Sequence, residues 1–342
     1  MSKANAWWQV LGYFSPLTAS RYEAVAYDSS PYINFYDWNT GTPVKLSDPA
    51  TLPTGQGNGV AWSADHLYTA VGHNTSPYIT IYYWGTGAPV KITDPASLPA
   101  GAAYKPAWSP NGRYLAVPHS GSPYVTIYDF NSGSPVKMAD PAILPAGNGT
   151  GAGWSPDGRY VAVTHATAPY VTIYDMQSGT PVKITNPATL PTGNGQDVKW
   201  SPNGTYMAVG HTTSPYVSIY DWTSGSPVKI TDPVSLPTGE VRGVDWSYDS
   251  RYLGAVSLGS PYLHQWDFGT GTPVAEVAPT TPPVAALVGI GFSNLANVFG
   301  CGGSGPPYLR NYNYDTFPAS SLSVSASPPG NTVRDVKWGG AL

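Results

Sequence analysis

The chain has 342 residues, of which 38 are glycine and 36 are proline. Charged residues make up only 11%, and a net charge of −4 with 16 basic residues offers no concentrated basic surface for nucleic acid. So many prolines leave few uninterrupted helical windows, while a hydrophobic content of 41% is enough for a substantial core. We therefore expect an all-β protein and exclude helical, disordered and nucleic-acid-binding classes.

The N-terminal segment 1–14 differs from the rest of the chain. It contains Trp7 and Trp8, and residues 11–14 are a degenerate copy of a motif that recurs later. We expect this segment to be a docking arm or an added edge strand, with 15–342 forming a single domain. The opening residues lack a basic segment followed by an apolar run, and no stretch is long enough to cross a bilayer. The sequence thus predicts synthesis in the cytoplasm without a signal peptide and no membrane insertion.

Two motifs recur along the chain at a constant spacing of 46 residues. One is a Pro-Tyr dipeptide, which occurs seven times between Pro31 and Pro307. The other ends in an aromatic residue, found at Trp62, Trp108, Trp154, Trp200, Trp246, Phe292 and Trp338. A fixed period of this length is the signature of a repeat architecture. The sequence therefore predicts seven repeats.

Within one repeat, short β-branched and aromatic runs alternate with turn residues, which is the pattern of strands joined by hairpins. Pro202-Asn203-Gly204 marks a tight turn between the first two strands, and Thr223-Ser224-Gly225 marks a turn before the fourth. The four strands expected in this repeat are 198–201, 206–211, 216–221 and 227–231.

A four-stranded antiparallel sheet cannot bury both of its faces alone. Seven such sheets arranged radially form a β-propeller, whereas an open stack would form a solenoid. Closure is favoured because residues 335–338 repeat 197–200 exactly in sequence, so the C-terminal end supplies a spare inner strand. We predict that the segment 333–338 completes the first blade beside 21–47 and removes an exposed edge.

The run Trp-Ser-Pro-Asp-Gly at 154–158, with Tyr174-Asp175 after it, resembles the WD-repeat propeller family. Tyr replaces the usual Trp before Asp, and the Gly-His dipeptide of that family is missing. A closer resemblance is to repeat proteins of phages and prophages reading LPTGNG, WSPDG and SPY, as at 190–195 and 211–216. This resemblance implies a seven-bladed propeller at a virion surface, as a capsid decoration or a tail-associated component.

Four histidines share one repeat position at the end of the second strand: His73, His119, His165 and His211. A ring of histidines can bind a metal or sense pH, or each can hydrogen-bond the adjoining loop. Metal ligands converge at about 2 Å from one ion, whereas equivalent positions on packed sheets are about 10 Å apart. We favour the structural role, and we predict no metal and no cofactor.

The tyrosine of the Pro-Tyr motif offers a second repeated side chain. Aromatic rings with a hydroxyl can stack on sugars, and one site per blade would give avidity; more often such rings pack between blades. We favour packing and leave glycan contact open for Tyr78, Tyr124, Tyr170 and Tyr216.

Charged side chains also follow the repeat. On the outer strand, lysines are expected to deter edge pairing. On the inner strand, Lys199 and Asp245 occupy equivalent positions of adjacent repeats, and we expect them to pair across the interface. Cys301 is the only cysteine, which excludes an intrachain disulfide, and we expect it to be buried.

The sequence contains no phosphate-binding loop, catalytic triad or calcium loop, and its acidic residues recur with the repeat. An enzyme on a symmetric propeller would break the symmetry at its catalytic groups, yet the breaks at 1–20, 279–283 and 301–307 are poor in titratable residues. We therefore predict no enzymatic activity and no catalytic residue. The irregular sector instead suggests a docking surface formed by Trp7, Trp8, Pro282, Pro283, Arg310, Tyr312 and Tyr314.

The function that follows is a non-catalytic structural or interaction module. It would dock as a rigid disc on other virion proteins or on copies of itself, at a virion surface. The alternative is a receptor- or glycan-binding propeller that contacts a host surface glycan through the repeated loops of one face. The unvarying interval of 46 residues weakens this alternative, because binding loops usually vary in length.

Overall fold

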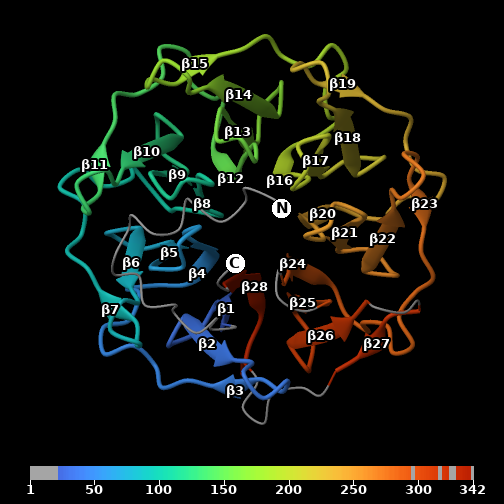
Figure 1. The fold of residues 1–342 in the computed structure, drawn as a ribbon, viewed down its shortest axis with the longest axis horizontal. Helices are drawn as coiled ribbons and strands as arrows, with labels where there is room; N and C mark the ends of the chain where they lie inside the picture. Colours follow the sequence, from blue (N-terminus) through green and yellow to red (C-terminus); the bar gives the residue numbers. More distant parts are fainter. Residues whose placement is uncertain (1–21, 294–296, 315–317, 323–328, 340–342) are drawn as a thin grey trace, which may run out of the picture.

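The computed structural model describes residues 22–293, 297–314, 318–322 and 329–339. Within these ranges the chain forms β-strands and no helix, so none of the described segments is a helix that could cross a membrane. The strands make seven four-stranded antiparallel sheets, which stand as blades around a central axis (Figure 1). The predicted all-β, seven-bladed β-propeller is confirmed.

The two inner strands of each blade lie nearest the axis, and all of them have five to seven residues except the two-residue strand β8. In blades one to seven the innermost strands are β28 (Val333–Gly339), β4 (Gly57–Trp62), β8 (Ala107–Trp108), β12 (Gly149–Trp154), β16 (Gly195–Trp200), β20 (Val241–Trp246) and β24 (Leu287–Phe292). The second strands are β1 (Tyr22–Tyr27), β5 (Tyr68–His73), β9 (Tyr114–Pro118), β13 (Tyr160–His165), β17 (Tyr206–His211), β21 (Tyr252–Ser257) and β25 (Val298–Gly303).

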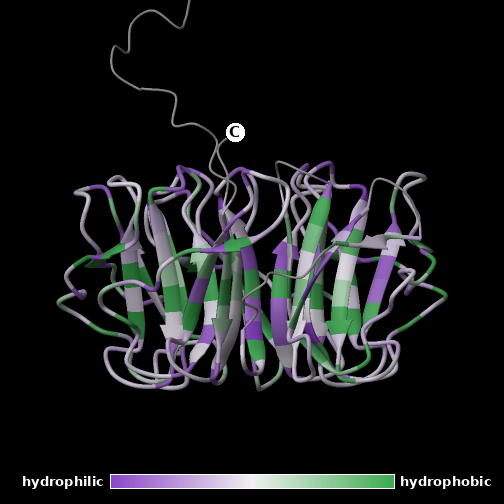
Figure 2. Ribbon diagram, turned by 90° about the horizontal axis from the view of Figure 1, so that it is seen from below, coloured by the Kyte–Doolittle hydropathy of each residue, from purple (hydrophilic) through white to green (hydrophobic). Residues whose placement is uncertain are grey.

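The two outer strands complete each blade. The third strands are β2 (Ile33–Asp37), β6 (Ile79–Tyr83), β10 (Val125–Asp129), β14 (Val171–Asp175), β18 (Val217–Asp221), β22 (Leu263–Asp267) and β26 (Leu309–Asn313). The outermost are β3 (Val44–Lys45), β7 (Val90–Lys91), β11 (Val136–Lys137), β15 (Val182–Lys183), β19 (Val228–Lys229), β23 (Val274–Ala275) and β27 (Ser320–Ser321). Viewed from the edge, the disc carries hydrophobic residues along the strands (Figure 2).

In blade five the strand limits agree with prediction to within one residue except at two places. The first strand begins at Gly195, three residues earlier than expected, and the fourth is limited to Val228 and Lys229. The fourth strand is short because its pairing runs only from Val228 opposite Asp221 to Lys229 opposite Tyr220, and the chain then leaves the sheet toward Pro233, which has no N–H to donate. A short edge strand presents little unpaired backbone to other molecules.

The hairpin after the innermost strand of blades two to six begins with Ser and carries Asp or Asn two residues later, as in Ser-Pro-Asp-Gly of blade four. In blade four, Asp157 accepts hydrogen bonds from the Ser155 hydroxyl and from the Arg159 amide, at 2.5 and 3.0 Å. Gly158 has a φ of +71°, a conformation that glycine adopts without a Cβ penalty. The turn residues therefore fix the hairpin locally, before any contact between blades.

The repeated tryptophans pack between blades. Trp108 stacks on Tyr68 of the preceding blade with ring centroids 5.9 Å apart, and Trp154 stacks on Tyr114 in the same way. Flat stacking at this distance is favourable beyond the area that it buries. The same stacking between blades recurs at Trp62 on Tyr22 and at Trp246 on Tyr206. Trp200, Phe292 and Trp338 contact an aromatic ring of their own blade.

The ring is closed by the C-terminal strand. Strand β28 pairs antiparallel with β1, from Tyr22 opposite Gly339 to Tyr27 opposite Val333, as the sequence predicted for 333–338 (Figure 1). The expected N-terminal arm, 1–14, lies outside the described residues.

A carboxyl group is buried where blade one meets blade seven. Glu23 is fully buried, and its Oε2 accepts from Trp38 Nε1 at 3.0 Å and from Asn311 Nδ2 at 3.3 Å. Burial raises the pKa of Glu23 to about 8, against the lowering effect of these two hydrogen bonds. The junction therefore favours a protonated Glu23 at neutral pH.

Candidate functional site

A cavity of about 330 Å³ opens at one end of the propeller axis. Its lining includes one residue from every blade, always the fourth residue before the repeated aromatic of the innermost strand. Lys105, Asn148 and Ala166 complete the lining. The seven equivalent residues, in chain order, are Asn58, Tyr104, Thr150, Gln196, Arg242, Val288 and Arg334. We call this set the axial ring.

The residues of the axial ring change from repeat to repeat. The second strands of blades two and five read Tyr-Thr-Ala-Val-Gly-His and Tyr-Met-Ala-Val-Gly-His, a single difference in six positions. The axial ring instead holds six residue types in seven positions, with arginine alone used twice. Because these side chains are partly exposed to one shared cavity, their differences give the cavity an uneven lining of cationic, amide, hydroxyl and apolar groups.

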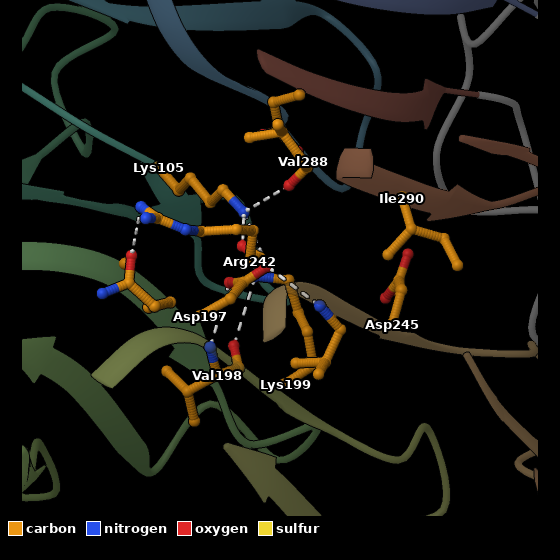
Figure 3. A network of polar contacts seen from close by, with 12 residues as sticks. Lys105, Asp197, Val198, Lys199, Arg242, Asp245, Val288 and Ile290 are labelled. Carbon is orange, nitrogen blue, oxygen red and sulfur yellow. Dashed lines mark hydrogen bonds and ion pairs between the residues drawn. The ribbon is translucent and has the colours of Figure 1, made fainter. Parts of the chain in front are cut away.

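Lys105 forms the floor of the cavity (Figure 3). Its Nζ lies 3.3 Å from Asp197 Oδ2, 3.4 Å from the Val288 carbonyl oxygen, and within hydrogen-bond distance of the Arg242 carbonyl oxygen. One side chain from blade three thus reaches blades five, six and seven. Lys105 is only 6% exposed, so it stands between the cavity and the rest of the channel.

The strand that carries Lys105 is irregular. Strand β8 has two residues, whereas the other innermost strands have six or seven. Pro106 stands where other repeats have Val, Ala or Ile, and proline cannot donate to the ladder. The backbone at Lys105 instead forms an isolated parallel bridge to Gly151 of the next blade. The symmetry of the propeller is therefore broken at 103–106, a place that sequence reasoning did not identify.

Asp197 anchors this floor from below. It is fully buried, and besides Lys105 it accepts from the Val198 and Val244 amides at 2.9 and 3.3 Å and from Lys199 Nζ at 3.3 Å. Burial acts to raise its pKa, but Lys105, Lys199 and Lys337 outweigh burial, and the pKa of Asp197 falls to about 2. Asp197 therefore carries a fixed negative charge that holds the ammonium groups around it.

A second layer of charges lies deeper in the channel. Lys337 donates to the Ile290 carbonyl at 2.6 Å and lies 3.8 Å from both Asp245 and Asp335. Although burial acts to lower it, these carboxylates hold the pKa of Lys337 above its usual range. Acidic residues therefore do converge, contrary to the expectation that they only follow the repeat.

The expected pairing of Lys199 with Asp245 is wrong. Lys199 turns toward Asp197 and donates to the Ala152 carbonyl of the preceding blade at 3.0 Å. Asp245 accepts from the Phe292 amide of the following blade at 3.0 Å, with Lys337 as its cation. Lys199 hydrogen-bonds the backbone of the preceding blade, whereas Asp245 hydrogen-bonds the backbone of the following blade. The two side chains therefore do not meet.

The two arginines of the axial ring are held by partners at the edge of the cavity. Arg242 pairs with Glu240, and its Nη1 donates to Gln196 Oε1 at 3.2 Å. Arg334 Nη2 lies 3.8 Å from Asp28 Oδ2. None of these carboxylates lines the cavity, whereas both guanidinium groups do.

The opposite end of the channel has a different lining. A hollow of about 230 Å³ is bordered by Trp62, Trp108, Trp154 and Trp338, with Lys199 and Lys337 reaching toward it from the channel wall. These tryptophans are the repeated aromatics that pack between blades, so this end repeats one residue type where the other end varies.

The four repeated histidines do not come together. Each is fully buried in its own blade, and its Nε2 lies 2.9 to 3.0 Å from a hydroxyl of the third strand, at Thr80, Thr126, Thr172 or Ser218. Burial lowers the pKa of each of the four to about 4. No cluster of His, Cys, Asp or Glu in the part of the chain that the structure describes has the arrangement of a metal site.

The four candidate glycan-contact tyrosines are also kept apart, one in each of blades two to five. Tyr78, Tyr124, Tyr170 and Tyr216 have φ between 65° and 69°, the left-handed region. Their carbonyl oxygens accept from the amide of the repeated histidine, as from His73 to Tyr78 at 2.9 Å. The rings are half-buried, and none of them lines the axial cavity.

The predicted docking surface is not assembled as expected. Tyr312 and Tyr314 are buried in the core of blade seven, and the Tyr312 hydroxyl donates to the Thr281 carbonyl at 3.0 Å. They were expected at the surface because the sequence around them is irregular, but Tyr312 occupies the position of the core tyrosine of other third strands. Pro283 is buried, Pro282 is exposed and Arg310 is half-buried, while Trp7 and Trp8 lie outside the described residues.

Comparisons with known proteins bear on the fold. No protein-family model matches the chain, and no curated protein matches its sequence. Among solved structures, a proposed 6-phosphogluconolactonase from Bacteroides uniformis is 15% identical, with a TM-score of 0.74 over 94% of this chain and 99% of that one. The periplasmic gluconolactonase of Pseudomonas aeruginosa is 17% identical, with a TM-score of 0.68 over 93% and 99%. A chain of the mitotic checkpoint complex is 17% identical, with a TM-score of 0.62 over 83% and 86%.

These neighbours correct the expectation that the chain is not an enzyme. Two of the three are named for a lactonase, which is a hydrolase, so a propeller of this shape does not argue against catalysis. None of the three is a phage repeat protein, so the resemblance of the repeat to phage proteins has no counterpart among them. At identities of 15 to 17% the similarity shows the fold alone: the chain is a seven-bladed β-propeller.

Proposed function

We propose that this propeller binds a small polyhydroxylated molecule in the axial cavity. The observation that carries the proposal is the axial ring, since it holds six residue types in seven positions and all seven side chains face one cavity. The repeated aromatic of the same strands is instead Trp in six blades and Phe in one. Different side chains around one cavity instead suit an asymmetric ligand.

The groups in the cavity match the chemistry of a sugar. Amides and hydroxyls offer donors and acceptors to ligand hydroxyls, and an aromatic ring can cover an apolar sugar face. Asn58 Nδ2 already donates to the Ala103 carbonyl at 2.9 Å, which fixes the orientation of its amide. Thr150 Oγ1 donates to the Gly195 carbonyl at 2.6 Å, so its acceptor lone pairs are positioned. Tyr104 supplies the aromatic surface.

The size of the cavity sets the size of the ligand. A volume of about 330 Å³ lies near the lower limit of small-molecule pockets, which suits one sugar unit. Names of two structural neighbours refer to lactones of gluconate and its phosphate, and these support the same class of molecule. The alternative of glycan binding through repeated loops is thereby replaced by a single axial site, which can take a free sugar or the end of a glycan.

Calorimetric titration with glucose, gluconate and glucono-lactone tests the proposal, and acid release from the lactone reports turnover. We expect binding that Tyr104→Ala and Gln196→Ala each weaken at least about tenfold. Tyr78→Ala is the matched control, because Tyr78 lies in a repeated loop outside the cavity, and its binding curve should equal that of the parent. Equal losses for Tyr78→Ala and Tyr104→Ala, or no binding of any of the three, would overturn the proposal.

We also propose, on the resemblance of the repeat to phage proteins, that the disc belongs to a particle surface and contacts other particle proteins or copies of itself. The axial cavity would then face a host sugar. Sedimentation of intact particles, with the copy number counted in the pellet, tests this role. A fixed ratio to the major particle protein supports it, and absence from washed particles contradicts it.

A further inference from the structure

The axial ring is electrically uneven. Going around the axis through blades five, six, seven, one and two, the ring residues are Gln196, Arg242, Val288, Arg334 and Asn58. The one aliphatic member, Val288, stands between the two arginines. We infer that the cavity holds an anionic group of its ligand, a carboxylate or a phosphate, over Val288 between Arg242 and Arg334. This inference rests on the proposed function and specifies the charge and orientation of the ligand.

Three cations and no carboxylate line the cavity. The Lys105 ammonium lies beside the Val288 carbonyl oxygen, 3.4 Å away. This ammonium also donates to the Arg242 carbonyl oxygen. The backbone carbonyl oxygens of Arg242 and Val288 therefore both point toward the Lys105 ammonium. The three N–H donors of Lys105 are taken by Asp197 and these two carbonyls, so Lys105 contributes positive charge, while N–H donors to a ligand anion come from the two guanidinium groups, which is the arrangement that anions prefer.

The carboxylates near these cations orient them without filling the site. Asp197 is fully buried beneath Lys105. Glu240 and Asp28 hold Arg242 and Arg334 but do not line the cavity. A guanidinium has five donors, and the hydrogen bonds and ion pairs of Arg242 with Glu240 and Gln196 use two of its nitrogens. Arg334 is held by Asp28 and, with the Gln56 amide turned so that its oxygen accepts, by Gln56 through Nη2 and Nε, which leaves Nη1 of Arg334 for a ligand.

The other half of the cavity has no charge. Tyr104 and Thr150 stand in blades three and four, and the Asn148 side chain precedes Thr150. An anion over Val288 would leave the neutral part of the ligand on this side, beside the hydroxyl, amide and aromatic groups. The ligand class that fits both halves is a sugar acid or a sugar phosphate, held with its anion toward blade seven.

Filling the site with a tethered carboxylate tests the inference without knowing the ligand. In Val288→Glu, the new carboxylate would lie between Arg242 and Arg334 and occupy the place of the ligand anion. Val288→Gln is the matched control, since it has the same length and no charge. We expect Val288→Glu to melt at a higher temperature than Val288→Gln at pH 8 and low salt, with the difference lost in 1 M salt. A lower melting temperature for Val288→Glu would overturn the inference.

Ligand titrations give the second readout. With the parent protein, gluconate and glucose 6-phosphate should bind at least tenfold more tightly than glucose, and whichever of the two binds better identifies the anion. Val288→Glu should weaken the anionic ligands at least a hundredfold, and Val288→Gln should weaken them far less. If glucose binds as tightly as both anions, the anion site is wrong while the proposed function stands. If no sugar binds but the melting temperatures separate as expected, the anion site stands and the proposed function fails.

Discussion

The rim and the axis of this propeller use their residues in opposite ways. On the rim, outermost strands repeat one Val-Lys pair in blades one to five, and the lysine forms the same contact three residues on, as in Lys91–Asp94 at 2.6 Å. At the axis, the ring of residues facing the cavity changes from blade to blade. The difference shows where a repeated fold can be specific: only the axis brings all seven repeats to one place, so single substitutions there build one site.

The two regions also differ in what their charges contribute. The rim ion pairs are partly exposed, and such pairs contribute about 0 to 1 kcal/mol each. The axial charges are buried, and they form hydrogen bonds with the backbone of neighbouring blades. Removing one member of an axial ion pair therefore leaves the opposite charge buried and unpaired.

The largest effect expected is acid unfolding through the repeated histidines. Their pKa is about 4 when folded against about 6.5 when unfolded. Between these values the histidines of the unfolded chain bind more protons, so the stability that they contribute is complete above pH 6.5 and is lost as the pH decreases. Each histidine contributes up to about 1.4 kcal/mol per pH unit to the free energy of unfolding. The four together therefore contribute up to about 5 kcal/mol per pH unit. Denaturant unfolding between pH 4.5 and 7 measures this slope.

His211→Gln is the control for that slope. Glutamine keeps a hydrogen-bonding group near Ser218 and does not titrate. Burial also lowers the pKa of His264 to about 4, so the slope due to these five histidines should decrease by about a fifth. An unchanged slope would mean that the buried histidines do not govern acid unfolding.

Asp197→Ala should give the next largest effect. It leaves Lys105 and Lys199 without their carboxylate and the Val244 amide without its acceptor, which costs about 3 to 5 kcal/mol in the free energy of unfolding. Asp140→Ala removes an exposed rim partner of Lys137 and should cost less than about 1 kcal/mol. Urea unfolding compares the two variants, and equal losses would contradict the distinction between axis and rim.

A smaller effect is expected where the ring closes. Because Glu23 has a raised pKa of about 8, the folded state binds more protons than the unfolded state between about pH 4.5 and 8. Stability should therefore fall across this window as the pH rises, by up to about 1.4 kcal/mol per pH unit. In Glu23→Gln this fall should disappear, so the variant should gain on the parent as the pH rises. Melting curves at pH 5, 7 and 9 measure it; parallel curves would show that Glu23 is ionised in the folded protein.

No effect on ligand binding is expected at the repeated loops. Tyr216→Phe removes a half-buried hydroxyl that does not face the axial cavity. Titration with gluconate should give the dissociation constant of the parent protein. A tenfold loss would move the binding site from the axis to the repeated face.

The fold could be predicted because it depends on spacing. The interval between equivalent tryptophans and prolines gave the number of blades, and the match of 335–338 to 197–200 identified the closing strand. The site could not be found in the same way, because attention went to irregular segments such as 301–307. Comparing the repeats at the position of Asn58 and Arg242 would have revealed the varied position. The reach of Lys105 across the axis could not be inferred, since it depends on the diameter of the closed ring and on the broken strand at Pro106.

A crystal structure of the protein with bound gluconate tests the central claim most directly. We expect the sugar acid in the axial cavity, its carboxylate over Val288 within hydrogen-bond distance of Arg242 and Arg334, and its hydroxyls beside Tyr104 and Thr150. Gluconate bound at the repeated tyrosine loops or among the tryptophans at the opposite end of the channel, with the axial cavity empty, would contradict the claim.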